Sequence, residues 1–110
     1  MNQGDVYWYT FHEPDKRRPV LILTRDSAIG FLSSLTIAPI TTTIRSIPSE
    51  VILTSHDGMA QECAVNLDNI QTVTKVKLHG YITHLSSERM AEVRDAISFA
   101  LGFDFDSMGG

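Results

Sequence analysis

The stretch DKRRPVLILTRD, residues 15–26, decides the fold that we expect for this chain. Its centre, Val20 to Leu23, is apolar at four consecutive positions, which is typical of a strand buried on both faces. Pro19 and the turn before it are expected to fix where this strand begins. Three cations stand at that start: Lys16, Arg17 and Arg18. They are unexpected there because the formal net charge of the chain is -4.

The rest of the chain predicts more short strands. Aromatic, β-branched and apolar runs between turn residues favour strands at residues 5–11, 35–40, 50–54, 61–67 and 70–76. We therefore expect five or six strands in all. Ser27 to Ser34 is expected to be a loop. Pro39 should bend or end its strand or place it at a sheet edge, and His56 to Gly58 should form a hairpin-type turn.

One helix is predicted after the strands. From Ser86 onward, apolar residues recur at helical spacing: Met90, Val93, Ile97 and Leu101. Ser86 or Ser87 can cap the first turn, and Gly102 can end the helix in a left-handed conformation. Strands followed by one helix indicate a mainly β or α+β fold, and strands this short favour a small, strongly bent barrel.

Three aromatic residues stand apart from that apolar stripe. Phe99 lies opposite Met90 on a helical wheel, and Phe103 and Phe105 follow the helix. One interpretation is a tolerated surface aromatic. The other is a contact with another protein chain.

Composition limits the classes of protein to consider. The chain has 110 residues, which fits one domain spanning 1–110. No apolar run approaches the ~20 residues that span a bilayer, and the N-terminus does not resemble a signal peptide. A single cysteine, Cys63, cannot form an intrachain bridge, so we expect a cytoplasmic protein without a membrane partner. The negative charge argues mildly against nucleic acid, although local patches decide recognition.

Motifs for metal or cofactor chemistry are lacking in the sequence. It has no Cys-x-x-Cys and no His-x-x-x-His, and we expect His79 and His84 to be surface or hydrogen-bonded residues. Cys63 is expected to be an inert core residue. A ribonuclease that uses His12 as its base is chemically sound, but the spacing does not favour it. We predict no metal and no cofactor.

A row of hydroxyls next to arginine indicates phosphate chemistry. Thr41 to Thr43 precede Arg45, and a guanidinium binds oxyanions bidentately while hydroxyls donate beside it. The alternative is a solvent-facing edge of a strand. In RNA cleavage the substrate supplies its own nucleophile, the 2′-OH, so positioning and charge stabilisation can suffice.

Four blocks, in this order, resemble the MazF/PemK toxins of bacterial toxin–antitoxin pairs: GDVYWYTF, RRPVLILTRD, IAPITTTIRSIPSEVIL and LDNIQTVTKVKLHGYITHLSSERMAEVRDAI. The resemblance implies an SH3-like barrel of the CcdB/MazF type with a C-terminal helix, acting as a homodimer. It also implies a metal-independent endoribonuclease (an mRNA interferase) that cleaves single-stranded RNA. The 2′-OH would attack the phosphate and leave 2′,3′-cyclic phosphate and 5′-OH ends.

The resemblance also implies roles for individual residues. Arg18, just before the Pro-Val step, and Thr41 correspond to the catalytic residues of the family. Glu13 keeps the spacing of a family glutamate, but His12 replaces the family serine. Together with the residue patterns above, the resemblance predicts these RNA-binding residues: Glu13, Lys16, Arg17, Thr42, Arg45, Gln71 and Lys75. Trp8 or a tyrosine is expected to stack a base.

The loop between the first two strands is shorter than is usual in the family and lacks its glycines. We expect Lys16 and Arg17 to replace contacts that the longer loop would make.

The implied partner is an antitoxin whose disordered acidic tail occupies the RNA groove, and with which the toxin binds DNA. Two alternatives remain open. One is a toxin of the same fold that inhibits DNA gyrase, as CcdB-type proteins do through a Trp-Gly-Ile ending that this chain lacks. The other is a barrel that binds RNA or peptide without cleaving it.

Overall fold

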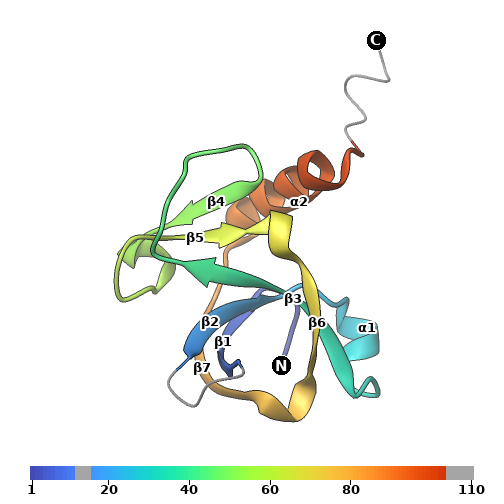
Figure 1. Ribbon diagram of the computed structural model, residues 1–110. Helices are drawn as coiled ribbons and strands as arrows, with labels where there is room; N and C mark the ends of the chain where they lie inside the picture. Colours follow the sequence, from blue (N-terminus) through green and yellow to red (C-terminus); the bar gives the residue numbers. More distant parts are fainter. Residues whose placement is uncertain (12–15, 104–110) are drawn as a thin grey trace.

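The computed structural model describes residues 1–11 and 16–103, in which seven antiparallel strands are followed by a C-terminal helix (Figure 1). The strands are β1 (Asp5–Thr10), β2 (Arg17–Ile22), β3 (Ser34–Thr41), β4 (Glu50–Leu53), β5 (Cys63–Asn66), β6 (Gln71–Thr74) and β7 (Leu78–His84). The helices are α1 (Asp26–Ile29) and α2 (Ser87–Leu101), with 3₁₀ turns η1 (Ser55–Asp57), η2 (Leu67–Asn69) and η3 (Lys75–Lys77). The predicted fold class is confirmed.

The strands follow the order β4-β5-β3-β2-β1-β7, and β6 also pairs with β3. The outer strands, β4 and β7, do not pair with each other, so the sheet is curved but open. Strand β3 pairs with β6 through residues 34–37 and with β5 through Ile40 and Thr41. Pro39 lies between these two pairings. The strand therefore does not end at the proline but changes partner there.

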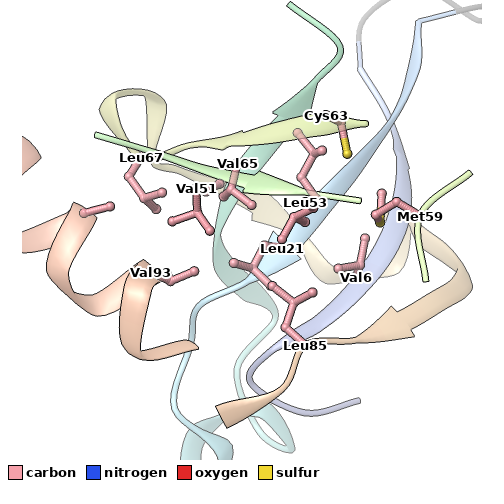
Figure 2. Close-up of a cluster of buried hydrophobic side chains, with 13 residues drawn as sticks. Val6, Leu21, Val51, Leu53, Met59, Cys63, Val65, Leu67, Leu85 and Val93 are labelled. Carbon is pink, nitrogen blue, oxygen red and sulfur yellow. The ribbon is translucent and has the colours of Figure 1, made fainter. Parts of the chain in front are cut away.

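Strand β2 lies between β1 and β3 and is buried on both faces, as its apolar run predicts. Val20, Leu21 and Ile22 have no exposed surface. Leu21 belongs to the cluster drawn in Figure 2. In this cluster Val51 and Leu53 come from β4, Leu85 from the chain just before α2, and Val93 from α2. Val20 and Ile22 belong to a second cluster on the other face. Its remaining members are Tyr9, Ile29, Leu35, Ile37, Val73 and Leu78.

Helix α2 begins and ends where the sequence predicts. The Ser86 hydroxyl accepts the N–H of Arg89 at 3.1 Å, and Gly102 adopts φ 78° at the C-terminus. Arg89 ties the helix to η1, because its Nε donates to Asp57 Oδ1 at 3.0 Å. Burial alone would raise the pKa of Asp57, but this hydrogen bond, the N–H of Thr54 and the charge of Arg89 together lower it.

The face that α2 buries differs from the prediction at one end. Val93 is buried and Met90 and Ile97 pack against the first cluster, but Leu101 is 56% exposed. Leu101 continues the apolar spacing, but it is the last residue of the helix and does not belong to the first cluster. Phe99 and Phe103 are exposed, as both interpretations of them require. Phe105 lies outside the described residues.

Several smaller predictions are corrected. Residues 27–34 are not all loop, because α1 buries Ala28 and Ile29. The expected turn at 56–58 is a 3₁₀ turn, which Thr54 and Asp57 cap reciprocally. Strand β7 was not counted, although it pairs along β1. Strand β2 begins at Arg17 and not at Pro19, so two of the three cations lie within the strand.

In the described part of the chain, no helix has the length and apolar character that crossing a membrane requires.

Candidate active site

Arg18 and Thr41 stand between two hollows in the surface. The first hollow has a volume of about 520 Å³ and the second about 540 Å³. Three residues line both: Arg18, Ile40 and Thr41. The arginine and the threonine that the sequence singled out are thus brought together, although 22 residues lie between them in the chain.

The alternation of β2 sends its two arginines to different faces. Successive side chains of a strand point to opposite faces, so Arg17 shares a face with Leu21, and Arg18 shares one with Val20 and Ile22. Arg17 accordingly lines only the first hollow, where Met59 and Cys63 of the first cluster also contribute. Because the apolar residues of β2 are buried, the arginines at its start are held in a fixed register.

The hydroxyl of Thr41 is oriented by its own chain. Its Oγ1 accepts the N–H of Thr43 at 3.1 Å. A hydroxyl that accepts one hydrogen bond still has its own O–H to donate. Thr41 can therefore donate to an oxyanion beside Arg18. Thr42 lines the first hollow and Thr43 the second.

Glu50 shapes the loop that connects β3 to β4. Its Oε1 accepts the N–H of Arg45 at 2.9 Å and that of Ser46 at 3.1 Å. Ser46 has φ 55°, a left-handed conformation that is uncommon outside glycine. The carboxylate thus holds the backbone around Arg45, which lines the second hollow together with Glu50.

The other predicted RNA-binding residues are placed as follows. Lys16 lines the first hollow and Gln71 the second. Lys75 lines neither, and its Nζ donates to the carbonyl of Ile29 at 2.6 Å. Glu13 lies outside the described residues. Trp8 lines the first hollow, but the guanidinium of Arg17 lies over its ring.

Three amide side chains of the site were not predicted from the sequence. Gln61 lines the first hollow, and Asn66 and Asn69 line the second. Their signal in the sequence is weak, since all three stand at strand ends or turns where amides are common. Cys63 reaches the wall of the first hollow from the core, and its burial raises the pKa of the thiol.

The charge of the site is strongly positive. Four of its lining residues are cations: Lys16, Arg17, Arg18 and Arg45. Among the described residues that line the two hollows, Glu50 is the one carboxylate. Beside the Thr41 hydroxyl, this arrangement suits a chain of phosphates.

His79 and His84 each contact one polar side chain. His79 Nε2 lies 3.2 Å from Thr10 Oγ1, and His84 Nδ1 lies 2.8 Å from Asp5 Oδ1. Within residues 1–11 and 16–103, no three His, Cys, Asp or Glu side chains gather closely enough to hold a metal ion.

A family model described as PemK-like, MazF-like toxin of type II toxin-antitoxin system matches residues 2–101. The chain belongs to this toxin family.

Relatives and solved structures agree with the family. The chain is 38% identical to "Probable endoribonuclease MazF5" of Mycobacterium tuberculosis, over 90% of this chain and 91% of that protein. It is 30% identical to "Endoribonuclease EndoA" of Bacillus subtilis, over 92% and 94%. The fold matches "Mycobacterium tuberculosis toxin MazF-mt6" with a TM-score of 0.84 at 35% identity, over 91% of this chain and 98% of that one.

The role of Glu50 gives a prediction about the loop. Glu50→Leu removes the acceptor of two N–H groups, so the amides of Arg45 and Ser46 should exchange hydrogen about tenfold faster, since a hydrogen bond to a charged group contributes about 1.5 kcal/mol. Glu50→Gln keeps an acceptor oxygen and should lose less protection. Native-state hydrogen exchange measures both variants, and unchanged protection in Glu50→Leu would show that another contact holds the loop.

Proposed function

We propose that the protein is the toxin of a type II toxin–antitoxin system and cleaves single-stranded RNA without a metal ion. The observation that carries the proposal is the placement of Arg18 beside Thr41, between two positively charged hollows. Membership of the toxin family and the names of the endoribonuclease relatives support it. They favour cleavage of RNA over inhibition of gyrase or binding alone.

The reaction needs few groups from the protein. The 2′-OH of the substrate attacks the adjacent phosphorus, so that the O2′–P bond forms and the P–O5′ bond breaks. The 2′ oxygen loses its proton and the departing 5′ oxygen gains one. Arg18 would neutralise the charge that builds on the phosphate, and the Thr41 O–H would donate to a non-bridging oxygen. The products are a 2′,3′-cyclic phosphate and a 5′-OH.

We propose that the substrate strand runs through both hollows. With the scissile phosphate between Arg18 and Thr41, one neighbouring nucleotide would enter each hollow. Lys16, Arg17 and Thr42 would contact the strand on the side of the first hollow, and Arg45 and Gln71 on the side of the second. Contacts from Glu13 and Lys75 stay predictions from the sequence.

We further propose that the toxin is a homodimer and that an antitoxin covers this site. Similar structures include one titled "Endoribonuclease in complex with its cognate antitoxin from Mycobacterial species", with a TM-score of 0.83 at 27% identity. An acidic tail would compete with RNA for the same cations. Light scattering at micromolar concentration should give the mass of a dimer, and a monomer mass would contradict the first part.

The assay of the reaction uses single-stranded RNA with excess EDTA. The wild-type protein should cleave, and Arg18→Ala should lower kcat/KM at least 10²-fold, which is the typical loss on removing one donor to a developing charge. Arg94→Ala is the matched control, because Arg94 is exposed on α2 and lines neither hollow. Intact RNA with the wild type, or equal cleavage by Arg18→Ala, would disprove the proposal.

A further inference from the structure

Arg17 and Trp8 form a contact in the first hollow that the proposed reaction does not use. The Cζ atom of Arg17 lies over the Trp8 ring, 4.3 Å from its centroid. The two residues lie on neighbouring strands, where Trp8 pairs with Pro19 and Thr10 pairs with Arg17. A guanidinium at this distance from an indole is attracted by the negative face of the ring.

The Trp8 ring is also confined by β7. A Cβ added to Gly80 would lie 3.0 Å from Trp8 Cδ1, and Gly80 has φ 77°. A side chain at this position would crowd the indole, and it would need a backbone conformation that favours glycine. The indole is therefore confined by the backbone of β7 near Cδ1 and by the guanidinium of Arg17 over the ring.

This arrangement changes which surface a base can meet. The ring face that Arg17 covers is not free to stack, whereas Arg17 itself is exposed and lines the hollow. A guanidinium is planar, weakly hydrated and able to stack on aromatic rings. With one side on Trp8, it can offer the other side to a second ring.

The walls of the first hollow suit the same kind of ligand. Met59 and Ile82 supply apolar surface, and Gln61 supplies an amide that can donate and accept hydrogen bonds. Sites for unpaired bases combine stacking planes of this kind with polar groups for the base edges. A phosphate alone would make no use of the apolar wall.

We propose that Arg17, stacked on Trp8, is a platform that binds a nucleobase of the RNA strand in the first hollow. The inference rests on the proposed function and names one base-binding site within it. It differs from the prediction that Arg17 is one of several RNA-binding residues and that Trp8 stacks the base directly. In this arrangement Trp8 is the support, and the guanidinium meets the base.

Affinity for an uncleavable strand tests the platform. The ligands are a fully 2′-O-methylated single-stranded RNA of mixed sequence and an abasic strand of the same length, measured by fluorescence anisotropy. Stacking of one base contributes about 1–3 kcal/mol, or about 5–150-fold in affinity. The wild type should therefore prefer the strand with bases, and Arg17→Lys should reduce that preference about tenfold while it keeps the charge.

Two further measurements separate stacking from charge. Lys16→Ala should weaken both strands equally and keep the wild-type preference, because it removes a charge without removing a stacking plane. Trp8 is the single tryptophan, so its emission should respond to the strand with bases and not to the abasic one. An unchanged preference in Arg17→Lys, or no preference in the wild type, would overturn the platform.

The proposed function can fail separately from the platform. Because the methylated strand cannot react, the binding experiment does not depend on cleavage. Loss of the base preference in Arg17→Lys, with full cleavage of ordinary RNA by Arg18→Ala, would uphold the platform and reject the reaction. An unchanged base preference in Arg17→Lys, with cleavage lost in Arg18→Ala, would reject the platform and leave the proposed reaction in place.

Discussion

Strand β2 is buried on both of its faces, and the geometry of the site depends on this constraint. Val20 and Ile22 pack into one cluster and Leu21 into the other, so a slip by one residue would exchange the two faces and misplace all three side chains in their clusters. Burying each such side chain contributes roughly 1.5–3 kcal/mol. The register of the strand is therefore fixed, and the residues that precede its apolar part are fixed with it.

Because the register of β2 is fixed, its two neighbouring arginines, Arg17 and Arg18, have different surroundings. Arg18 continues the face of Val20 and lines both hollows together with Thr41, whereas Arg17 continues the face of Leu21 and lies over Trp8. The two arginines are consecutive residues of the same strand. Adjacent residues of the same type can thus perform separate functions, because the pleat of the strand separates them.

Sequence patterns predicted the parts of the fold that depend on local signals. The run from Val20 and the cap residues Ser86 and Gly102 each carry a pattern that tertiary packing did not override. Strand β7 was missed because Gly80 interrupts it and most of its side chains are exposed, so neither composition nor alternation marks it. The short helix α1 is a single turn, which is too short to show helical periodicity.

The sequence predicted several residues that line the candidate site but not the shape of the site. Arginine next to hydroxyls indicated phosphate, and the family resemblance paired Arg18 with Thr41. The contact of Lys75 with the carbonyl of Ile29 joins residues 46 positions apart in the chain. Gln61 and Asn66 line the hollows only because the fold brings their segments beside Arg18. No local pattern encodes such neighbours.

The proposed reaction requires Arg18 and Thr41 to act together on one phosphate. A double-mutant cycle tests it, with kcat/KM for RNA measured for Arg18→Ala, Thr41→Ala and the double variant. Groups that act as a unit are strongly non-additive, so the double variant should lose little more than Arg18→Ala alone, whereas losses that multiply would contradict the claim.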